Sequence, residues 1–455
     1  MKRLVVLIGV LVVCATSSTA QDRRKVTEPR IPPVSRTLDA QLVTAKGDLA
    51  EADEDKLDTT RIQEAIDSCQ PGTAVELRSS GEKHAFLSAP LRLKPGITLL
   101  VAPETVLFAS RNPRDYDLTP GSCGKVDKTG HGCRPLIQIE QAKDVAIMGD
   151  GVIDGRGGAK LLGQKVSWWD LAQEAKIKQE SQNVPRILVA DRADGLILYR
   201  ITLRNSPNFH VFVRRTNGFT AWGVKIDAPR NARNTDGIDP SSSTNVSVLY
   251  SYISAGDDNV AIKAGADGPA TDITVAHSHF YNGHGMSIGS ETSGGVSAVE
   301  VSDLTIDGAD NGIRIKSNRT RGGLVHDVAY RDICIRDVKN PIVMETTYEH
   351  VTDGDLIPVF KSILLEDVRV YGEGKISLDG ADSAHPLQMR LDGVELSGVS
   401  PRNVHASHAQ IITGPGKVNF APLGEDVQVL SERGSRNVPS CDERFVPMAD
   451  LAASH

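Results

Sequence analysis

Short apolar segments that alternate with turn residues dominate the chain from about residue 85 to about residue 420. Gly, Asn and Asp separate each segment from the next. Four consecutive segments align without gaps near their apolar positions: NTDGIDPSS, DDNVAIKAG, GHGMSIGSE and DNGIRIKSN. With Ile238, Val260, Met286 and Ile313 taken as equivalent, the offsets are 22, 26 and 27 residues, a period typical of a solenoid.

This period predicts an all-β fold, a right-handed single-stranded parallel β-helix with about three short strands per coil and coils ~4.8 Å apart. Leucine-rich repeats share the period, but their fixed Leu and Asn positions are missing. The gaps are too short for the helix of a βαβ unit. Residues 58–69 have apolar side chains at helical spacing with Asp58 or Thr59 available as N-cap, and predict a helix that caps the N-terminal end. Residues 167–180 predict a second helix.

A polar column accompanies the aligned apolar positions. Counting back two residues from each gives Asp236, Asp258, His284 and Asn311, and Asp257 precedes the column by one residue. Carboxylates this close together raise one another's pKa, so one of them can stay protonated beside ionised neighbours. That arrangement supplies a general acid beside a general base. A calcium-binding or solvated Asn/Asp turn ladder, common in β-solenoids, is the alternative.

The N-terminal segment MKRLVVLIGVLVVCATSSTAQD combines two basic residues, an apolar run and small residues. It predicts a signal peptide over residues 1–20, cleaved after Ala20, with a membrane anchor or lipid attachment at Cys14 as alternatives. We therefore expect a secreted or periplasmic protein with no membrane association after cleavage. Loss of Lys2 and Arg3 would leave 49 of the 51 basic residues against 58 acidic ones, which argues against a nucleic-acid partner.

Five cysteines lie beyond this segment. Cys123 and Cys133 bracket a Gly-rich stretch, which predicts a loop disulfide in an oxidising compartment. No Cys-X-X-Cys or paired Cys/His spacing occurs, so we expect no structural zinc. The chain is predicted to comprise an extended lead-in over residues 21–40, a β-helix domain over 41–430 and a C-terminal tail over 431–455.

Four ordered motifs carry a resemblance to a known family. NTDG at 234–237, GDD at 256–258, GHG at 283–285 and RIK at 314–316 resemble the signature motifs of the polygalacturonases, glycoside hydrolase family 28. The resemblance covers roughly residues 40–420. Further matches are GVIDGRGG at 151–158, Trp168 and Trp169, and NSPNFHV at 205–211.

The resemblance implies a hydrolase that cleaves α-1,4-linked galacturonan with inversion, without metal or cofactor. It makes Asp257 the general acid that protonates the glycosidic oxygen. Asp236 and Asp258 would together activate the attacking water, and His284 would tune the acid by hydrogen bonding. The protein is expected to act on polygalacturonate as a monomer.

The same resemblance assigns substrate binding to other positions. Arg314 and Lys316 would bind a galacturonate carboxylate, which suits a bidentate guanidinium beside an ammonium. Tyr348 resembles the substrate-contacting tyrosine of the family, and Asn234 belongs to the first motif. His210, 26 residues before Asp236, is either a substrate contact one coil earlier or a packed turn histidine.

Several alternatives stay open at this point. A rhamnogalacturonan hydrolase, a pectic lyase or a non-catalytic carbohydrate-binding β-helix would use the same fold. Arg230, Arg233 and Lys263 form either a local basic patch for the polyanion or ordinary surface charge. We expect Trp168 and Trp169 to pack within the protein rather than to stack on a sugar ring.

Overall fold

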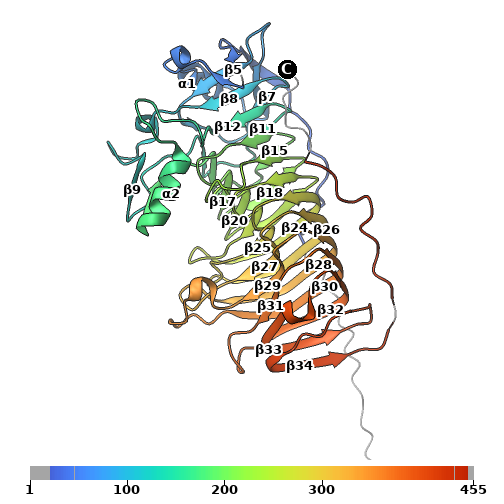
Figure 1. Cartoon of the computed structure of the whole chain (residues 1–455). Helices are drawn as coiled ribbons and strands as arrows, with labels where there is room; N and C mark the ends of the chain where they lie inside the picture. The colour runs from blue at the N-terminus through green and yellow to red at the C-terminus, as the bar shows by residue number, and fades with distance from the viewer. Residues whose placement is uncertain (1–20, 46, 435, 449–455) are drawn as a thin grey trace, which may run out of the picture.

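The structure, a computed structural model, describes residues 21–45, 47–434 and 436–448 (Figure 1). Short strands stack into successive coils along one axis. They pair in parallel from coil to coil, and the chain is the predicted right-handed parallel β-helix. The predicted signal peptide, residues 1–20, lies outside the described residues.

Three rows of parallel strands run along the solenoid. The front sheet comprises β6 (Leu91–Arg92), β10 (Ile137–Glu140), β14 (Leu188–Asp191), β17 (Val211–Arg214), β20 (Ile238–Ser241), β23 (Val260–Ile262), β25 (Met286–Ile288), β27 (Asn311–Lys316), β29 (Asn340–Glu345), β31 (Ile376–Asp379) and β33 (Val404–Thr413). The second row comprises β1 (Val34–Asp39), β4 (Thr73–Arg78), β7 (Ile97–Val101), β11 (Ala146–Met148), β15 (Ile197–Tyr199), β18 (Asn217–Trp222), β21 (Thr244–Leu249), β24 (Ala270–Tyr281), β26 (Val296–Asp307), β28 (Leu324–Arg336), β30 (Val359–Tyr371), β32 (Leu387–Ser397) and β34 (Gly424–Ser431). The third row comprises β5 (Ala85–Ser88), β8 (Val106–Ala109), β12 (Val152–Asp154), β16 (Thr202–Arg204), β19 (Lys225–Asp227) and β22 (Tyr252–Ser254), and joins β24.

The interior of the solenoid is a stack of aliphatic side chains. In the front sheet, Leu188, Val211, Ile238, Val260 and Met286 occupy equivalent positions on successive coils and are fully buried. A slip of one residue would turn each of these side chains outward, so burial fixes the register. The same register fixes which polar side chains become neighbours at the edge of the sheet.

Both predicted helices are present. α1 (Thr59–Ser68) begins after Asp58 and turns its apolar side chains into the core. Figure 1 places it near the first coils; its role in protecting that end stays a prediction. α2 (Trp168–Lys178) begins with a capping box in which Ser167 and Asp170 bond each other's backbone. Within the described ranges, no helix is both long and apolar enough to cross a membrane.

The chain ends lie against the coils. β1 falls inside the predicted lead-in and pairs with β4. Beyond β34 the tail is joined to β28 by a disulfide between Cys334 and Cys441. Arg444 of the tail also pairs with Asp303 and Asp332. The division into lead-in, domain and tail stays a prediction.

A second disulfide joins Cys123 to Cys133, as their spacing predicts. It closes a loop that contains β9 (Lys125–Asp127). β9 pairs in antiparallel fashion with β13 (Ser181–Asn183), and both strands flank α2. Cys69 is a buried free thiol.

Candidate active site

The strand register places the predicted polar column on adjacent coils. Ile238 pairs with Val260, Val260 with Met286, and Met286 with Ile313, which matches the sequence alignment. Two residues before them stand Asp236, Asp258, His284 and Asn311, at the edge of the front sheet.

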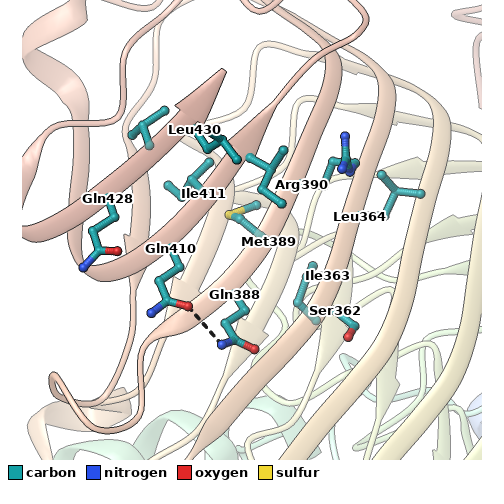
Figure 2. Close-up of a pocket in the computed structure, with 12 residues that line it drawn as sticks. Ser362, Ile363, Leu364, Gln388, Met389, Arg390, Gln410, Ile411, Gln428 and Leu430 are labelled. Atoms are coloured by element: carbon teal, nitrogen blue, oxygen red, sulfur yellow. Dashed lines mark hydrogen bonds between the residues drawn. The ribbon is translucent and has the colours of Figure 1, made fainter. Parts of the chain in front are cut away.

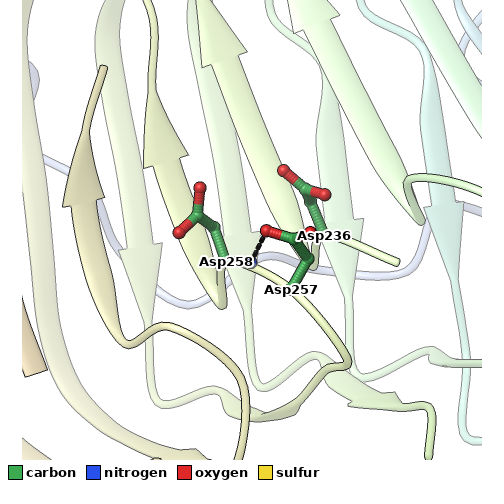
Figure 3. Close-up of side chains that lie close together, drawn as sticks. All are labelled: Asp236, Asp257 and Asp258. Atoms are coloured by element: carbon green, nitrogen blue, oxygen red, sulfur yellow. Dashed lines mark hydrogen bonds between the residues drawn. The ribbon is translucent and has the colours of Figure 1, made fainter. Parts of the chain in front are cut away.

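Three carboxylates converge at this edge (Figure 3). Asp236, Asp257 and Asp258 each offer an oxygen within 4.8 Å of the others. Asp257 Oδ1 accepts a hydrogen bond from the backbone N–H of Asp258 at 3.0 Å. The side chain of Asp257 is 23% exposed and that of Asp258 is 1% exposed. Asp257 is therefore the carboxylate of this group that a substrate reaches most easily.

Glycine makes this close approach of coils possible. A Cβ on Gly283 would lie 2.1 Å from the carbonyl oxygen of Asp257, and Gly283 has a φ of +59°. No L side chain fits there. The first glycine of GHG therefore lets the coil carrying His284 approach the coil carrying the aspartates.

Asp258 is held as a carboxylate by two cations. Lys316 donates to its Oδ2 at 2.9 Å, Arg314 pairs with its Oδ1, and Ser287 donates its hydroxyl to Oδ1 at 2.7 Å. Burial raises the pKa of Asp258, but the charges of Lys316 and Arg314 outweigh burial and hold the pKa well below its usual value. Asp258 is therefore ionised at mildly acidic and neutral pH.

Asp236 has the opposite environment. It is buried, and its Oδ1 has no hydrogen-bond partner among the described residues. Burial and the neighbouring carboxylates of Asp239 and Asp257 raise its pKa well above the usual value, although Lys263 Nζ lies 3.7 Å away. Asp236 therefore holds a proton more readily than an isolated aspartate, while Asp258 stays ionised.

Asp239 and Lys263 support this carboxylate group from within the front sheet. Lys263 Nζ lies 3.3 Å from Asp239 Oδ2, and both side chains are shielded from solvent. Burial raises the pKa of Asp239 to about 6 even with Lys263 beside it. The hypothesis of an open basic patch is therefore wrong for Lys263, because this ammonium faces two carboxylates. Arg230 is paired with Asp310 at 2.6 Å.

His284 lies beside Asp257, the most accessible of the three carboxylates. Its Nε2 lies 4.0 Å from Asp257 Oδ1, and the Asn311 amide lies 2.9 Å from its Nδ1. Burial and the charge of Arg314 lower the pKa of His284, which favours the neutral ring. If Asn311 donates to Nδ1, the proton of the neutral ring is on Nε2, directed toward Asp257.

Other predicted substrate contacts surround the aspartates. Asn234 Nδ2 lies 3.5 Å from Asp257 Oδ2. Tyr348 lies in η3 (Tyr348–His350), and Lys316 Nζ stands 4.9 Å from the centre of its ring. Arg314 and Lys316 are nearly buried and bind Asp258 in the structure. Their contact with a substrate carboxylate stays a prediction.

His210 is not on the polar column. Val211 pairs with Ile238, so Phe209 is level with Asp236 and His210 is level with Gly237. His210 is fully buried, and its Nδ1 lies 3.0 Å from the backbone oxygen of Asp236. Burial lowers its pKa to about 4. The prediction of a substrate contact is wrong, and the packed histidine describes this residue.

The two tryptophans pack as predicted. Trp168 is fully buried and meets Tyr116 edge to face. Trp169 donates its indole N–H to the backbone oxygen of Ser206 at 2.9 Å. These contacts hold α2 against the coils that precede the aspartates.

A separate hollow of about 820 Å³ lies on the last coils, between β30 and β34 (Figure 2). Its floor is apolar, with Met389 and Ile411, and its polar rim contains Gln388 and Gln410. It has no carboxylate among its lining residues. It therefore offers no acid and base, and the chemistry lies at the aspartates.

Sequence reasoning missed three contributors to the site. Asp239 stands one residue after an aligned apolar position, and Ser287 occupies the equivalent place two coils later, next to Asp258. Lys263 was expected either in a local basic patch or as ordinary surface charge, and not beside Asp236 and Asp239. The register that located Asp236 and Asp258 could have located Asp239 and Ser287, because all four follow from the same alignment.

Comparisons with known proteins identify the family. The family model for glycosyl hydrolases family 28 matches residues 103–413. An endo-polygalacturonase of Pectobacterium parmentieri is 41% identical over 86% of this chain and 94% of its own length. A polygalacturonase of Ralstonia solanacearum is 37% identical over 94% of this chain and 93% of its own length.

A solved structure supports the same assignment. The polygalacturonase from Erwinia carotovora ssp. carotovora superposes with a TM-score of 0.79 at 40% identity, over 85% of this chain and all of that one. An endo-xylogalacturonan hydrolase from Aspergillus tubingensis shares the fold at 20% identity and a TM-score of 0.55. The chain belongs to glycoside hydrolase family 28.

Proposed function

We propose that this chain is a secreted polygalacturonase, active as a monomer, that hydrolyses α-1,4-galacturonosyl linkages of pectin. The names of the relatives support the substrate, and the N-terminal sequence supports secretion. One observation supports acid/base hydrolysis: the two carboxylates beside Asp257 have opposite environments. Asp258 is held ionised by two cations, and burial raises the pKa of Asp236.

In the proposed reaction Asp257 gives its proton to the glycosidic oxygen as the bond from that oxygen to the anomeric carbon breaks. Asp236 and Asp258 hold a water molecule and take up its proton as its oxygen bonds to the anomeric carbon. His284 donates a hydrogen bond that stabilises Asp257 once it is ionised. Arg314 and Lys316 keep Asp258 ionised and bind the substrate carboxylate, with Tyr348 and Asn234 beside the sugar.

The spacing of the carboxylates bears on the stereochemistry. Inverting glycosidases commonly hold their two carboxyl groups ~6.5–9.5 Å apart, and retaining ones ~5–5.5 Å apart. Here the nearest oxygens of the three carboxylates lie within 4.8 Å. This is a distance between the nearest atoms and not between carboxyl groups, so the proposal of inversion rests on the motif assignment.

A metal ion is not required by the proposed reaction. The three carboxylates are close enough to bind a cation. However, Lys316 and Arg314 already occupy both oxygens of Asp258, and Lys263 lies beside Asp236. A lyase using Arg314 as base is disfavoured for the same reason, because this guanidinium is ion-paired and its pKa is raised, with Asp258 outweighing the effect of burial.

Incubation of the purified protein with polygalacturonate and a chelator tests the proposal. We expect saturated oligogalacturonates with new reducing ends. Unsaturated products that absorb in the ultraviolet, or activity that needs calcium, would show a lyase. A lack of cleavage of every pectic polymer would favour a binding protein, and cleavage of rhamnogalacturonan alone would assign that substrate instead.

A further inference from the structure

A groove lined by arginines lies on the front sheet before the aspartates. Its volume is about 670 Å³. No Asp or Glu is among its lining residues, although acidic residues outnumber basic ones by 58 to 51 in the whole chain. Its basic lining residues are Arg92, His131, Arg134, Arg186 and Arg214. Such a lining suits a ligand that carries several negative charges.

Arg186 stands in the same register as the aspartates. Leu188 pairs with Val211 and Val211 pairs with Ile238, so Arg186 and Phe209 occupy the two coils before Asp236. At ~4.8 Å per coil, Arg186 is about 10 Å from Asp236 along the solenoid axis. Burial lowers its pKa, and the charges of Asp239 and Asp236 partly offset that effect.

The guanidinium of Arg186 is held in place by two aromatic rings. Its central carbon lies 4.6 Å from the centre of the Phe209 ring and 4.7 Å from that of Phe212. Its Nε donates to Asn208 Oδ1 at 3.2 Å. These contacts fix the planar group before any ligand binds, which lowers the entropic cost of binding.

Arg186 also lacks an acidic partner in the part of the chain that the structure describes. Arg214, in the same groove, differs because it pairs with Asp191 at 3.0 Å. Arg92 lies 4.0 Å from Glu140. A fixed, half-buried guanidinium without an ion-pair partner among the described residues is suited to a carboxylate ligand, which it can bind through two parallel hydrogen bonds.

We propose that Arg186, held against Phe209 and Phe212, binds the carboxylate of a substrate uronate that lies beyond the sugar whose linkage is cut. The inference rests on the proposed function, since a uronate chain must extend along the front sheet. It gives the enzyme a preference for longer, charged substrates. A methyl-esterified unit at this place would lose the charge-assisted contact.

Arg186→Gln tests this assignment, with Arg186→Lys as the charge-preserving variant. The control is Arg402→Gln, which removes an exposed arginine on η4 (Pro401–Asn403), next to β33. KM and kcat are measured for each variant on galacturonate oligomers of increasing length, together with the melting temperature.

For Arg186→Gln we expect KM on long oligomers to rise about 10- to 100-fold, the usual worth of a charge-assisted hydrogen bond, with kcat little changed. KM on the shortest oligomers that are cleaved should not change. Arg186→Lys should recover part of the loss, and Arg402→Gln should match wild type.

An equal loss on short and long oligomers, or none on either, overturns the inference. A rise in KM that is accompanied by a fall in melting temperature in both Arg186 variants also overturns the inference. Failure of the wild type to cleave any galacturonan would instead refute the proposed function.

Discussion

Replacement of Lys316 by Met removes one of the two cations that ionise Asp258. The two side chains are only 6% and 1% exposed, and Nζ lies 2.9 Å from Oδ2. At that distance Coulomb's law gives about 1.4 kcal/mol at the dielectric constant of water and about 5.7 kcal/mol at an effective value of ~20. Since 1.36 kcal/mol corresponds to one pH unit, the base should require a pH higher by about one unit or more to ionise.

The assay is the pH profile of kcat on polygalacturonate at saturating substrate. We expect the acidic limb of the Lys316→Met profile to move to higher pH, in addition to any rise in KM from lost substrate binding. Arg314 still pairs with Asp258, so activity should persist at the optimum.

Lys339→Met is the matched control. Lys339 also pairs with an aspartate, Asp310, at 2.6 Å, but its side chain is 70% exposed. Exposed pairs contribute ~0–1 kcal/mol, so this variant should keep the profile of wild type. An acidic limb that stays in place in Lys316→Met would refute the claim that Lys316 keeps the catalytic base ionised.

Three further predictions concern stability and stereochemistry. Cys334→Ser, which removes the Cys334–Cys441 disulfide, should lower the melting temperature more than Cys123→Ser. The two disulfides span 107 and 10 residues, which corresponds to about 4.8 and about 2.7 kcal/mol of chain entropy in the unfolded state. Equal effects would contradict this ranking. Because the pKa of Asp236 is raised in the folded protein, its burial as an anion destabilises the fold as pH rises above the ordinary aspartate range. Asp236→Asn should therefore raise the melting temperature at pH 7 with little gain near pH 4 while abolishing activity, and a gain that is the same at both values would refute the assignment. Nuclear magnetic resonance of the first products should show the β-anomer if the enzyme inverts, whereas the α-anomer would show retention.

The fold was predictable because each coil repeats the same local requirement. Ile238, Val260, Met286 and Ile313 had to face inward, and their spacing alone aligned the coils that the structure pairs. The ends of the chain were less predictable. The contact of Arg444 with β26 and β28 joins residues more than a hundred positions apart, and no repeated sequence pattern indicates it.

The alignment of the coils predicted those site residues that lie on the polar column. Asp236, Asp258 and His284 follow from it directly. His210 was placed on the polar column because its sequence offset from Asp236 resembles one coil. The register differs by one residue, which moves the side chain from the edge of the sheet to the interior, and the offset alone does not show this. The pairing of Lys316 with Asp258 could not be predicted, because it depends on side-chain conformations across two coils.

The rate of Asp257→Asn on polygalacturonate tests the central claim most directly. Asparagine has nearly the same shape and cannot donate an acidic proton, so we expect kcat to fall about 10²- to 10⁴-fold with oligomer binding and melting temperature retained. Asp55→Asn, an exposed substitution near α1, should behave as wild type. An Asp257→Asn enzyme that keeps kcat within a few-fold of wild type would contradict the assignment of Asp257 as the proton donor.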